Sequence, residues 1–187
     1  MRSVKEIMRA SAVLDSNGVH VNGSDRESNH HYGDAYQRLL ECRFGGLDKV
    51  KLMMEVGVAD GSSLLAWREI FPNALCVGLD IHHSDKAHGE RIEFHLGDQR
   101  SQQDCERVAA GRLFDLIVDD ATHLLEDTLR TLYWLWSNVR PGGLYVVEEW
   151  PNVDPVRITA LWPQAKLVDT IGPSGGHEPL VVFRKPI

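Results

Sequence analysis

The sequence contains little cysteine, and what it has is widely scattered. Three cysteines occur in 187 residues, Cys42, Cys76 and Cys105, and no two of them form a C-x-x-C pair. An odd number of distant cysteines argues against a disulfide scaffold and against a cysteine-based zinc site. Cys76 lies within an apolar run, where a buried thiol packs like any small apolar side chain. We therefore expect a protein of the reducing cytoplasm that is stabilised by an apolar core.

Two further absences exclude whole classes of partner. No apolar run is long enough to cross a bilayer, and charges interrupt residues 1–16, so they do not form a secretory leader. Lys and Arg do not cluster, and the net charge is −7, with 20 basic and 27 acidic residues. Since nucleic-acid-binding proteins usually present a basic face to phosphates, we expect neither a membrane nor a nucleic acid as partner.

Short apolar runs alternate with helical patterns from about residue 51 onward. Such alternation is typical of a parallel sheet whose crossover helices cover both faces. The last two runs are joined through Gly172-Pro173-Ser174-Gly175-Gly176, a connection too short for a crossover helix, which predicts an antiparallel hairpin at the sheet edge. The predicted strands are Leu52–Val56, Leu75–Asp80, Ile92–Leu96, Phe114–Asp119, Leu144–Glu148, Ala165–Ile171 and Pro179–Arg184.

Helical periodicity is clearest between residues 124 and 139. One face of this segment is apolar, and the segment ends at Arg140-Pro141-Gly142-Gly143, a sequence that stops a helix. Trp134 lies off the apolar face, which fits either a subunit contact in a homo-oligomer or a single surface aromatic. The apolar face consists of Leu125, Leu129, Leu132, Trp136 and Val139.

Ahead of the sheet, two helices are predicted over Val4–Leu14 and Asp34–Phe44, with a polar loop from Asn22 to His30 between them. We expect a single domain over residues 1–187. Within it, residues 1–46 would form a helical lid and residues 47–187 an α/β core. A chain of this length can bury roughly two-thirds of its unfolded surface in one core.

The segment Glu55-Val56-Gly57-Val58-Ala59-Asp60-Gly61-Ser62 connects the first of these strands to a helix. Glycines in such a turn let backbone N–H groups face a ligand without a side chain in the way. The dinucleotide fingerprint G-x-G-x-x-G would need glycine at Ala59 and Ser62, so NAD is disfavoured. The pattern instead resembles the first motif of class I S-adenosylmethionine (SAM) methyltransferases, which implies their Rossmann-like seven-stranded fold.

Acids recur at the ends of the following strands. Asp80 ends the second strand, about 20 residues beyond the glycines, where a carboxylate can accept both ribose hydroxyls. Asp98 and Gln99 follow the third strand, beside the expected adenine. Open α/β sheets bind ligands at these strand ends, and acids suit the sulfonium charge of SAM. The predicted cofactor residues of the core are Glu55, Gly57, Gly61, Ser62, Asp80, Asp98, Gln99 and Asp119.

Two acid pairs follow the fourth and fifth strands. Asp119 and Asp120 lie just before His123, and Glu148 and Glu149 end the fifth strand. Four carboxylates at one rim repel one another unless a cation or protons intervene, and Mg²⁺ with oxygen ligands would relieve that repulsion. Such an ion could lower the pKa of a substrate hydroxyl, with His123 as general base. The alternatives are that some acids face solvent and that His123 caps a helix.

These motifs carry a closer family resemblance. D-D-x-x-H at 119–123 and P-G-G-L-Y-V-V-E-E at 141–149 resemble the metal-dependent sugar O-methyltransferases of macrolide and related antibiotic pathways, the mycinamicin and tylosin type. A relative associated with cephamycin biosynthesis is also similar. The family usually has Asp where Glu149 stands. The resemblance implies His123 as the base and Mg²⁺ held by three ligands, Asp120, Glu148 and Glu149.

A third motif precedes the sheet. The segment from His30 to Tyr36 is similar to the family's His-Tyr-x-x-x-Tyr segment, which implies that Tyr32 closes over SAM or the substrate. The alternative is an ordinary helix with core tyrosines.

We therefore predict a SAM-dependent, Mg²⁺-assisted O-methyltransferase that acts on a hydroxyl of a sugar or glycosylated natural product. Two alternatives stay open. The acceptor could be a catechol-like diol or an amine, or the chain could be a SAM-binding accessory subunit of low activity.

Overall fold

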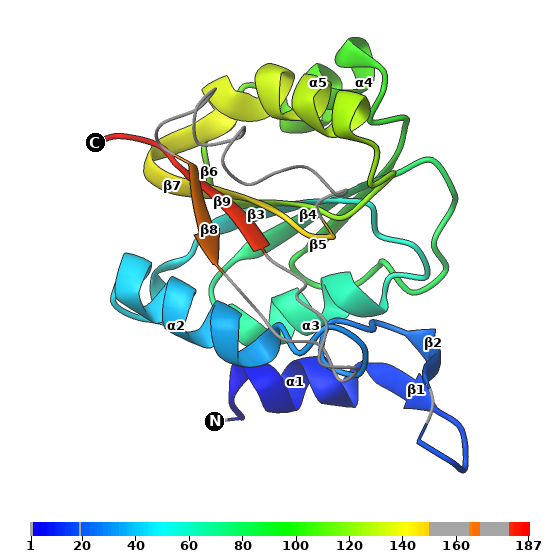
Figure 1. Ribbon diagram of the computed structural model, residues 1–187. Coiled ribbons are helices and arrows are strands. Elements are labelled where there is room, and N and C mark those ends of the chain that lie inside the picture. The colour runs from blue at the N-terminus through cyan, green and yellow to red at the C-terminus, as the bar shows by residue number, and fades with distance from the viewer. Residues whose placement is uncertain (1, 19, 150–164, 169–179) are drawn as a thin grey trace.

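The structure is a computed structural model that describes residues 2–18, 20–149, 165–168 and 180–187 (Figure 1). The predicted turn at residues 172–176 lies outside the described residues, as does Trp150, which follows the second acid pair.

Seven strands form one central sheet in the order β5-β4-β3-β6-β7-β9-β8. Strand β9 runs antiparallel to both β7 and β8, so the antiparallel strand lies one place in from the edge. The other described pairs of this sheet are parallel, as expected for near-continuous apolar runs joined by helices. The predicted sheet is confirmed, except that its fifth strand begins at Val139 rather than Leu144, so the predicted helix stop at residues 140–143 lies in that strand. The strands are β3 (Leu52–Val56), β4 (Leu75–Asp80), β5 (Ile92–Leu96), β6 (Phe114–Asp119), β7 (Val139–Val147), β8 (Ala165–Val168) and β9 (Leu180–Arg184).

Helices cover both faces of the sheet and enclose two apolar cores (Figure 1). The face with α1, α2 and α3 buries Trp67, and the face with α4 and α5 buries Leu132 from the predicted apolar stripe. Trp134 packs against that second core, whereas its neighbour Tyr133 is 74% exposed. In the described part of the chain, no helix is long and apolar enough to cross a membrane. The helices are α1 (Val4–Ala10), α2 (Gly33–Phe44), α3 (Ser62–Ile70), α4 (Gln102–Ala109) and α5 (Leu125–Leu135), with 3₁₀ turns η1 (Leu47–Lys49) and η2 (Trp136–Asn138).

The N-terminal segment differs from its prediction. The helix expected over Val4–Leu14 ends at Ala10, and the chain continues into a small antiparallel hairpin of β1 (Ala12–Leu14) and β2 (His20–Gly23). The connection begins with Asp15, whose Oδ1 accepts the N–H of residue 17 at 2.8 Å. The turn chemistry of Asp-Ser-Asn-Gly therefore outweighs the apolar periodicity that predicted a longer helix.

Candidate cofactor and metal site

A cavity of about 430 Å³ lies where β3, β4, β5 and β6 end. The loop after β3 forms part of its wall, together with residues that follow the other three strands and residues 23–26 ahead of α2. Open α/β sheets bind ligands at this position. Four predicted cofactor residues and one predicted metal ligand line the cavity: Gly57, Asp80, Asp98 and Gln99, and Asp120.

Gly57 brings the loop after β3 against the end of β6. Its φ is +87°, a left-handed conformation that favours glycine. A Cβ at this position would lie 2.2 Å from the carbonyl oxygen of Asp120, closer than real Cβ atoms approach. The backbone contact therefore requires glycine, and it fixes Asp120 beside the cavity.

Asp80 braces the same loop from the end of β4. Its Oδ2 accepts the N–H groups of Val58 at 2.7 Å and Ala59 at 2.8 Å, and its Oδ1 accepts the N–H of His82 at 2.7 Å. A carboxylate has about four acceptor positions. Asp80 therefore holds the loop in place and keeps room to accept a donor from the cavity.

Asp98 and Gln99 are both held at the end of β5. The hydrogen bonds from Arg100 lower the pKa of Asp98, which stays ionised. Gln99 is buried; its Nε2 donates to Thr131 Oγ1 at 3.1 Å, and its Oε1 accepts the N–H of Thr122 at 2.9 Å. These bonds fix the end of β5 against the segment that follows β6.

Five predicted cofactor residues are not among those that line the cavity: Glu55, Gly61, Ser62, Asp119 and Tyr32. Glu55 is fully buried and accepts hydrogen bonds from Ser63 Oγ at 2.9 Å and Trp67 Nε1 at 3.0 Å. Asp119 points to the opposite face of the sheet, where it accepts from the Tyr145 hydroxyl at 2.8 Å. Burial raises the pKa of Asp119 to about 7, although the Tyr145 bond opposes that rise.

The other three lie close to the cavity wall. Gly61 begins α3 with φ +92° and packs against the loop after β4. Ser62 donates from its N–H and its hydroxyl to Asp60. Tyr32 is fully buried, and its hydroxyl oxygen accepts the N–H of Glu149 at 3.4 Å.

Arg26, which the sequence reasoning missed, joins three of the predicted acids. Its guanidinium is 3% exposed and forms ion pairs of 2.7 to 2.9 Å with Glu55, Asp120 and Glu148. It also lies 5.5 Å from the centre of the Trp67 ring, a cation–π contact. The polar loop that carries Arg26 has no periodicity, so the only signal was the excess of acids that called for a cation.

Burial and charge act in opposite directions in this group. Burial lowers the pKa of Arg26, but Glu148, Asp120 and Glu55 raise it above its usual range, so the guanidinium stays charged. Burial raises the pKa of both Glu55 and Asp120, and Arg26 limits that rise. Tyr36 completes the group by donating its hydroxyl hydrogen to Glu148. Burial and the Glu148 charge raise the pKa of Tyr36, which keeps its proton.

Asp120, His123 and Glu149 form a cluster at the rim, with one donor atom of each within 4.8 Å of the others. The His123 Nε2 atom lies 3.9 Å from Asp120 Oδ1 and 3.8 Å from Glu149 Oε2. Glu148 points away from this cluster, toward Arg26 and Tyr36. The structure thus brings two of the three predicted metal ligands to the predicted base, and it does not bring Glu148 there.

The sheet order, the helices on both faces and the glycine loop define the class I methyltransferase fold. A solved structure of the mycinamycin-pathway methyltransferase MycE, in complex with Mg, S-adenosylhomocysteine (SAH) and mycinamycin VI, has a TM-score of 0.66 and 25% identity to this chain. The match covers 84% of this chain and 49% of that one. The N-methyltransferase NodS from Bradyrhizobium japonicum, solved with SAH, matches over both whole chains with a TM-score of 0.60. Its identity of 16% shows the fold alone.

Two curated relatives extend this likeness to the sequence. Demethylmacrocin O-methyltransferase of Streptomyces fradiae is 35% identical over 153 residues, 75% of this chain. Mycinamicin VI 2''-O-methyltransferase of Micromonospora griseorubida is 35% identical over 122 residues, 59% of this chain. The chain spans 37% and 28% of the lengths of these relatives, and no protein-family model matches it. The resemblance to macrolide-sugar O-methyltransferases that the motifs indicated is confirmed.

Gly57→Ala tests the contact between the glycine loop and β6. The new Cβ would collide with Asp120, so we expect a loss of stability beyond the roughly 1–2 kcal/mol of a left-handed alanine, together with weaker SAH binding. Gly111→Ala is the matched control, because Gly111 also has a positive φ, +68°, but has nothing within 4 Å of an added Cβ. Equal losses in the two variants, measured by urea unfolding, would contradict the proposed contact.

Arg26→Met tests the buried ion group. Removing the guanidinium leaves buried carboxylates unpaired, so we expect the free energy of unfolding to fall by about 3–5 kcal/mol. The exposed Arg38→Met should change it by less than about 0.5 kcal/mol. A second substitution, Glu148→Gln, should restore part of the stability of Arg26→Met. Urea unfolding of the four proteins measures this, and no recovery in the double variant would argue against charge as the cause.

The same variant should respond to pH in a defined direction. Burial already raises the pKa of Glu55 in the folded protein, and loss of Arg26 would raise it further. A folded-state pKa above the unfolded value means that the folded state binds more protons, so the variant gains stability as pH falls. We therefore expect the deficit of Arg26→Met to be smaller at pH 5 than at pH 8. A deficit that does not change with pH would contradict this.

Proposed function

We propose that this chain is a SAM-dependent O-methyltransferase that acts on a hydroxyl of a sugar or glycosylated natural product with the help of Mg²⁺. One observation carries the proposal. Asp120 both lines the cavity and belongs to the cluster with His123 and Glu149. A methyl donor in the cavity would therefore lie next to groups that can activate an acceptor hydroxyl. The likeness to macrolide-sugar methyltransferases supports this assignment.

SAM would occupy the cavity at the ends of β3, β4 and β5. The backbone of the loop at Gly57 would face the methionine part, and Asp80 would accept from the ribose hydroxyls with its remaining acceptor position. Asp98 and Gln99 would lie beside the adenine. Glu55, Gly61, Ser62, Asp119 and Tyr32 would contribute indirectly, by holding the backbone that forms the cavity wall.

The donor set at the rim fits Mg²⁺. Asp120 and Glu149 offer carboxylate oxygens, the ligands that this ion prefers. Glu148 could become a ligand only after giving up its ion pair with Arg26. A solved relative, MycE, holds Mg and SAH together. When bound here, the ion would lower the pKa of a coordinated hydroxyl.

His123 would complete the reaction as the base. Its Nε2 would accept the hydroxyl proton while the oxygen attacks the methyl carbon of SAM. The O–CH₃ bond forms as the S–CH₃ bond breaks, which gives a methyl ether and SAH. Glu149, within 4 Å of His123 Nε2, would stabilise the imidazolium that results.

His123→Ala tests the base. We expect turnover to fall by about 10²–10⁴-fold, the range for loss of a general base, with SAH affinity unchanged. His88→Ala is the control, because His88 is exposed and is not among the residues that line the cavity. A panel of sugar, diol and amine acceptors read by mass spectrometry would measure turnover and identify the acceptor class. Tight SAH binding with no methylation of any acceptor would instead favour the accessory-subunit alternative.

Chelation tests the metal. EDTA should suppress methyl transfer, and added Mg²⁺ should restore it in the native protein but not in Asp120→Asn. The physical reason is that a neutral amide at position 120 removes one of the two carboxylates assigned to the ion. Full turnover in EDTA would remove the metal from the mechanism and leave the SAM assignment intact.

A further inference from the structure

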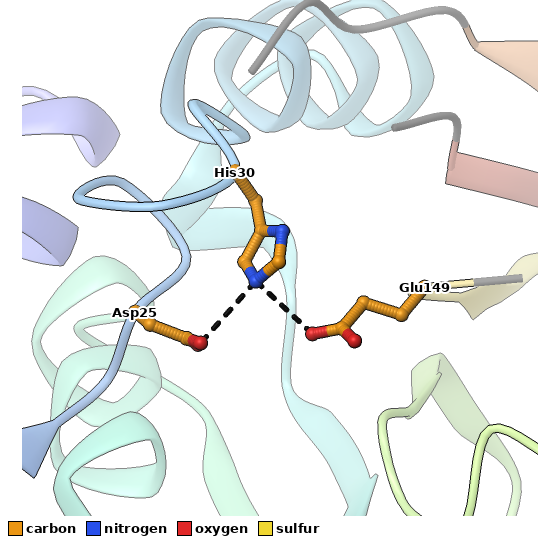
Figure 2. A group of neighbouring side chains, drawn as sticks. All are labelled: Asp25, His30 and Glu149. Atoms are coloured by element: carbon orange, nitrogen blue, oxygen red, sulfur yellow. Dashed lines mark hydrogen bonds and ion pairs between the residues drawn. The ribbon is translucent and has the colours of Figure 1, made fainter. Parts of the chain in front are cut away.

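We propose that Asp25, His30 and Glu149 form a second cation site, which shares Glu149 with the Asp120 cluster, binds Zn²⁺ and anchors the N-terminal segment to the end of β7. One donor atom from each residue lies within 4.8 Å of the other two. Asp25 and His30 come from the loop ahead of α2, and Glu149 follows β7 (Figure 2). Glu149 also belongs to the proposed Mg²⁺ set, whereas Asp25 and His30 were given no role in the cofactor chemistry described above.

The three side chains point toward one place. Figure 2 shows the His30 Nε2 atom between the two carboxylates, 3.2 Å from Asp25 Oδ2 and 3.0 Å from Glu149 Oε1. The His30 ring is stacked on Tyr32 with ring centres 5.2 Å apart, which holds its plane. The His30 side chain is 14% exposed, whereas those of Asp25 and Glu149 are 37% and 36% exposed, so an ion could enter from solvent.

A proton is a poor fit to this arrangement. One ring nitrogen carries at most one hydrogen, and a hydrogen shared between two acceptors bonds each of them at a poorer angle. Two carboxylates around one nitrogen are better satisfied by a cation that takes several ligands.

The donor types and their separations favour Zn²⁺. An imidazole nitrogen with two carboxylate oxygens suits zinc, whereas Mg²⁺ prefers oxygen alone. With metal–ligand distances near 2.0 Å, the ligands of a tetrahedral zinc lie about 3.3 Å apart. The two measured separations from His30 Nε2, 3.0 and 3.2 Å, are close to that value. The fourth position would be taken by water.

Glu149 connects this site to the rim cluster. Its Oε1 faces His30, and its Oε2 lies 3.8 Å from His123. Zinc at Asp25 and His30 would thus fix Glu149 and close residues 25–32 against the cavity, which Asp25 itself lines.

Metal-free full-length chain, dialysed against Zn²⁺ in excess Mg²⁺, provides the test, with bound metal measured by mass spectrometry. We expect His30→Gln to weaken Zn²⁺ binding by more than about 100-fold, beyond the loss typical of an outer-shell partner. His31→Gln is the matched control, because His31 is adjacent, exposed and outside the cluster. Asp25→Asn should weaken binding as His30→Gln does, and circular dichroism would identify a variant that fails to fold.

Two further variants separate this site from the rim cluster. Asp120→Asn and His123→Gln should keep the zinc, and Co²⁺ in its place should give the visible absorption of a tetrahedral N/O site. Zinc that is lost in these two variants but kept in His30→Gln would overturn the proposal, as would native protein that binds no zinc. Native protein that binds zinc but methylates no acceptor would instead count against the proposed function alone.

Discussion

The charge of Arg26 is the constraint on which the arrangement of the site depends. Three carboxylates, from β3, the end of β6 and the end of β7, approach one buried point, and none of them could stay ionised there without a cation. The guanidinium suits this role because its five N–H donors are fixed in one plane and can bond several acceptors. Since Arg26 comes from the loop ahead of α2, the same group also ties the N-terminal segment to the sheet.

The ion pairs with Arg26 explain why the four acids at the ends of β6 and β7 do not all face one metal ion. Each acid pair divides its side chains between two directions. Asp119 enters the core beside Tyr145 while Asp120 faces Arg26, and Glu148 faces Arg26 while Glu149 turns outward to two histidines. At the end of β6 this follows the alternation of side chains along a strand, whereas Glu149 follows β7 in a bend with a left-handed φ of +45°. The acids left for a metal are therefore the second member of each pair, Asp120 and Glu149.

The sequence predicted the sheet far better than the site. The four strands from Leu52 to Asp119 have their predicted bounds, because buried parallel strands read as continuous apolar runs between turn signals. Strand ends also identified where the acids lie. The directions of the acidic side chains could not be predicted, because a shift of one residue along a strand moves a side chain to the opposite face of the sheet. Arg26 could not be predicted either, because its partners Asp120 and Glu148 lie 94 and 122 residues away and no local pattern records them.

The contact between Gly57 and Asp120 connects the cavity at the glycine loop with the rim cluster. The glycine loop is held on one side by Asp80 and on the other by the backbone of Asp120, where no Cβ fits. A ligand that displaces this loop would therefore also displace Asp120, which pairs with Arg26 and belongs to the rim cluster. Close packing transmits such displacements because there is little free volume to absorb them. The spacing of the glycines, which first indicated a nucleoside cofactor, thus also sets where an acceptor hydroxyl would have to lie.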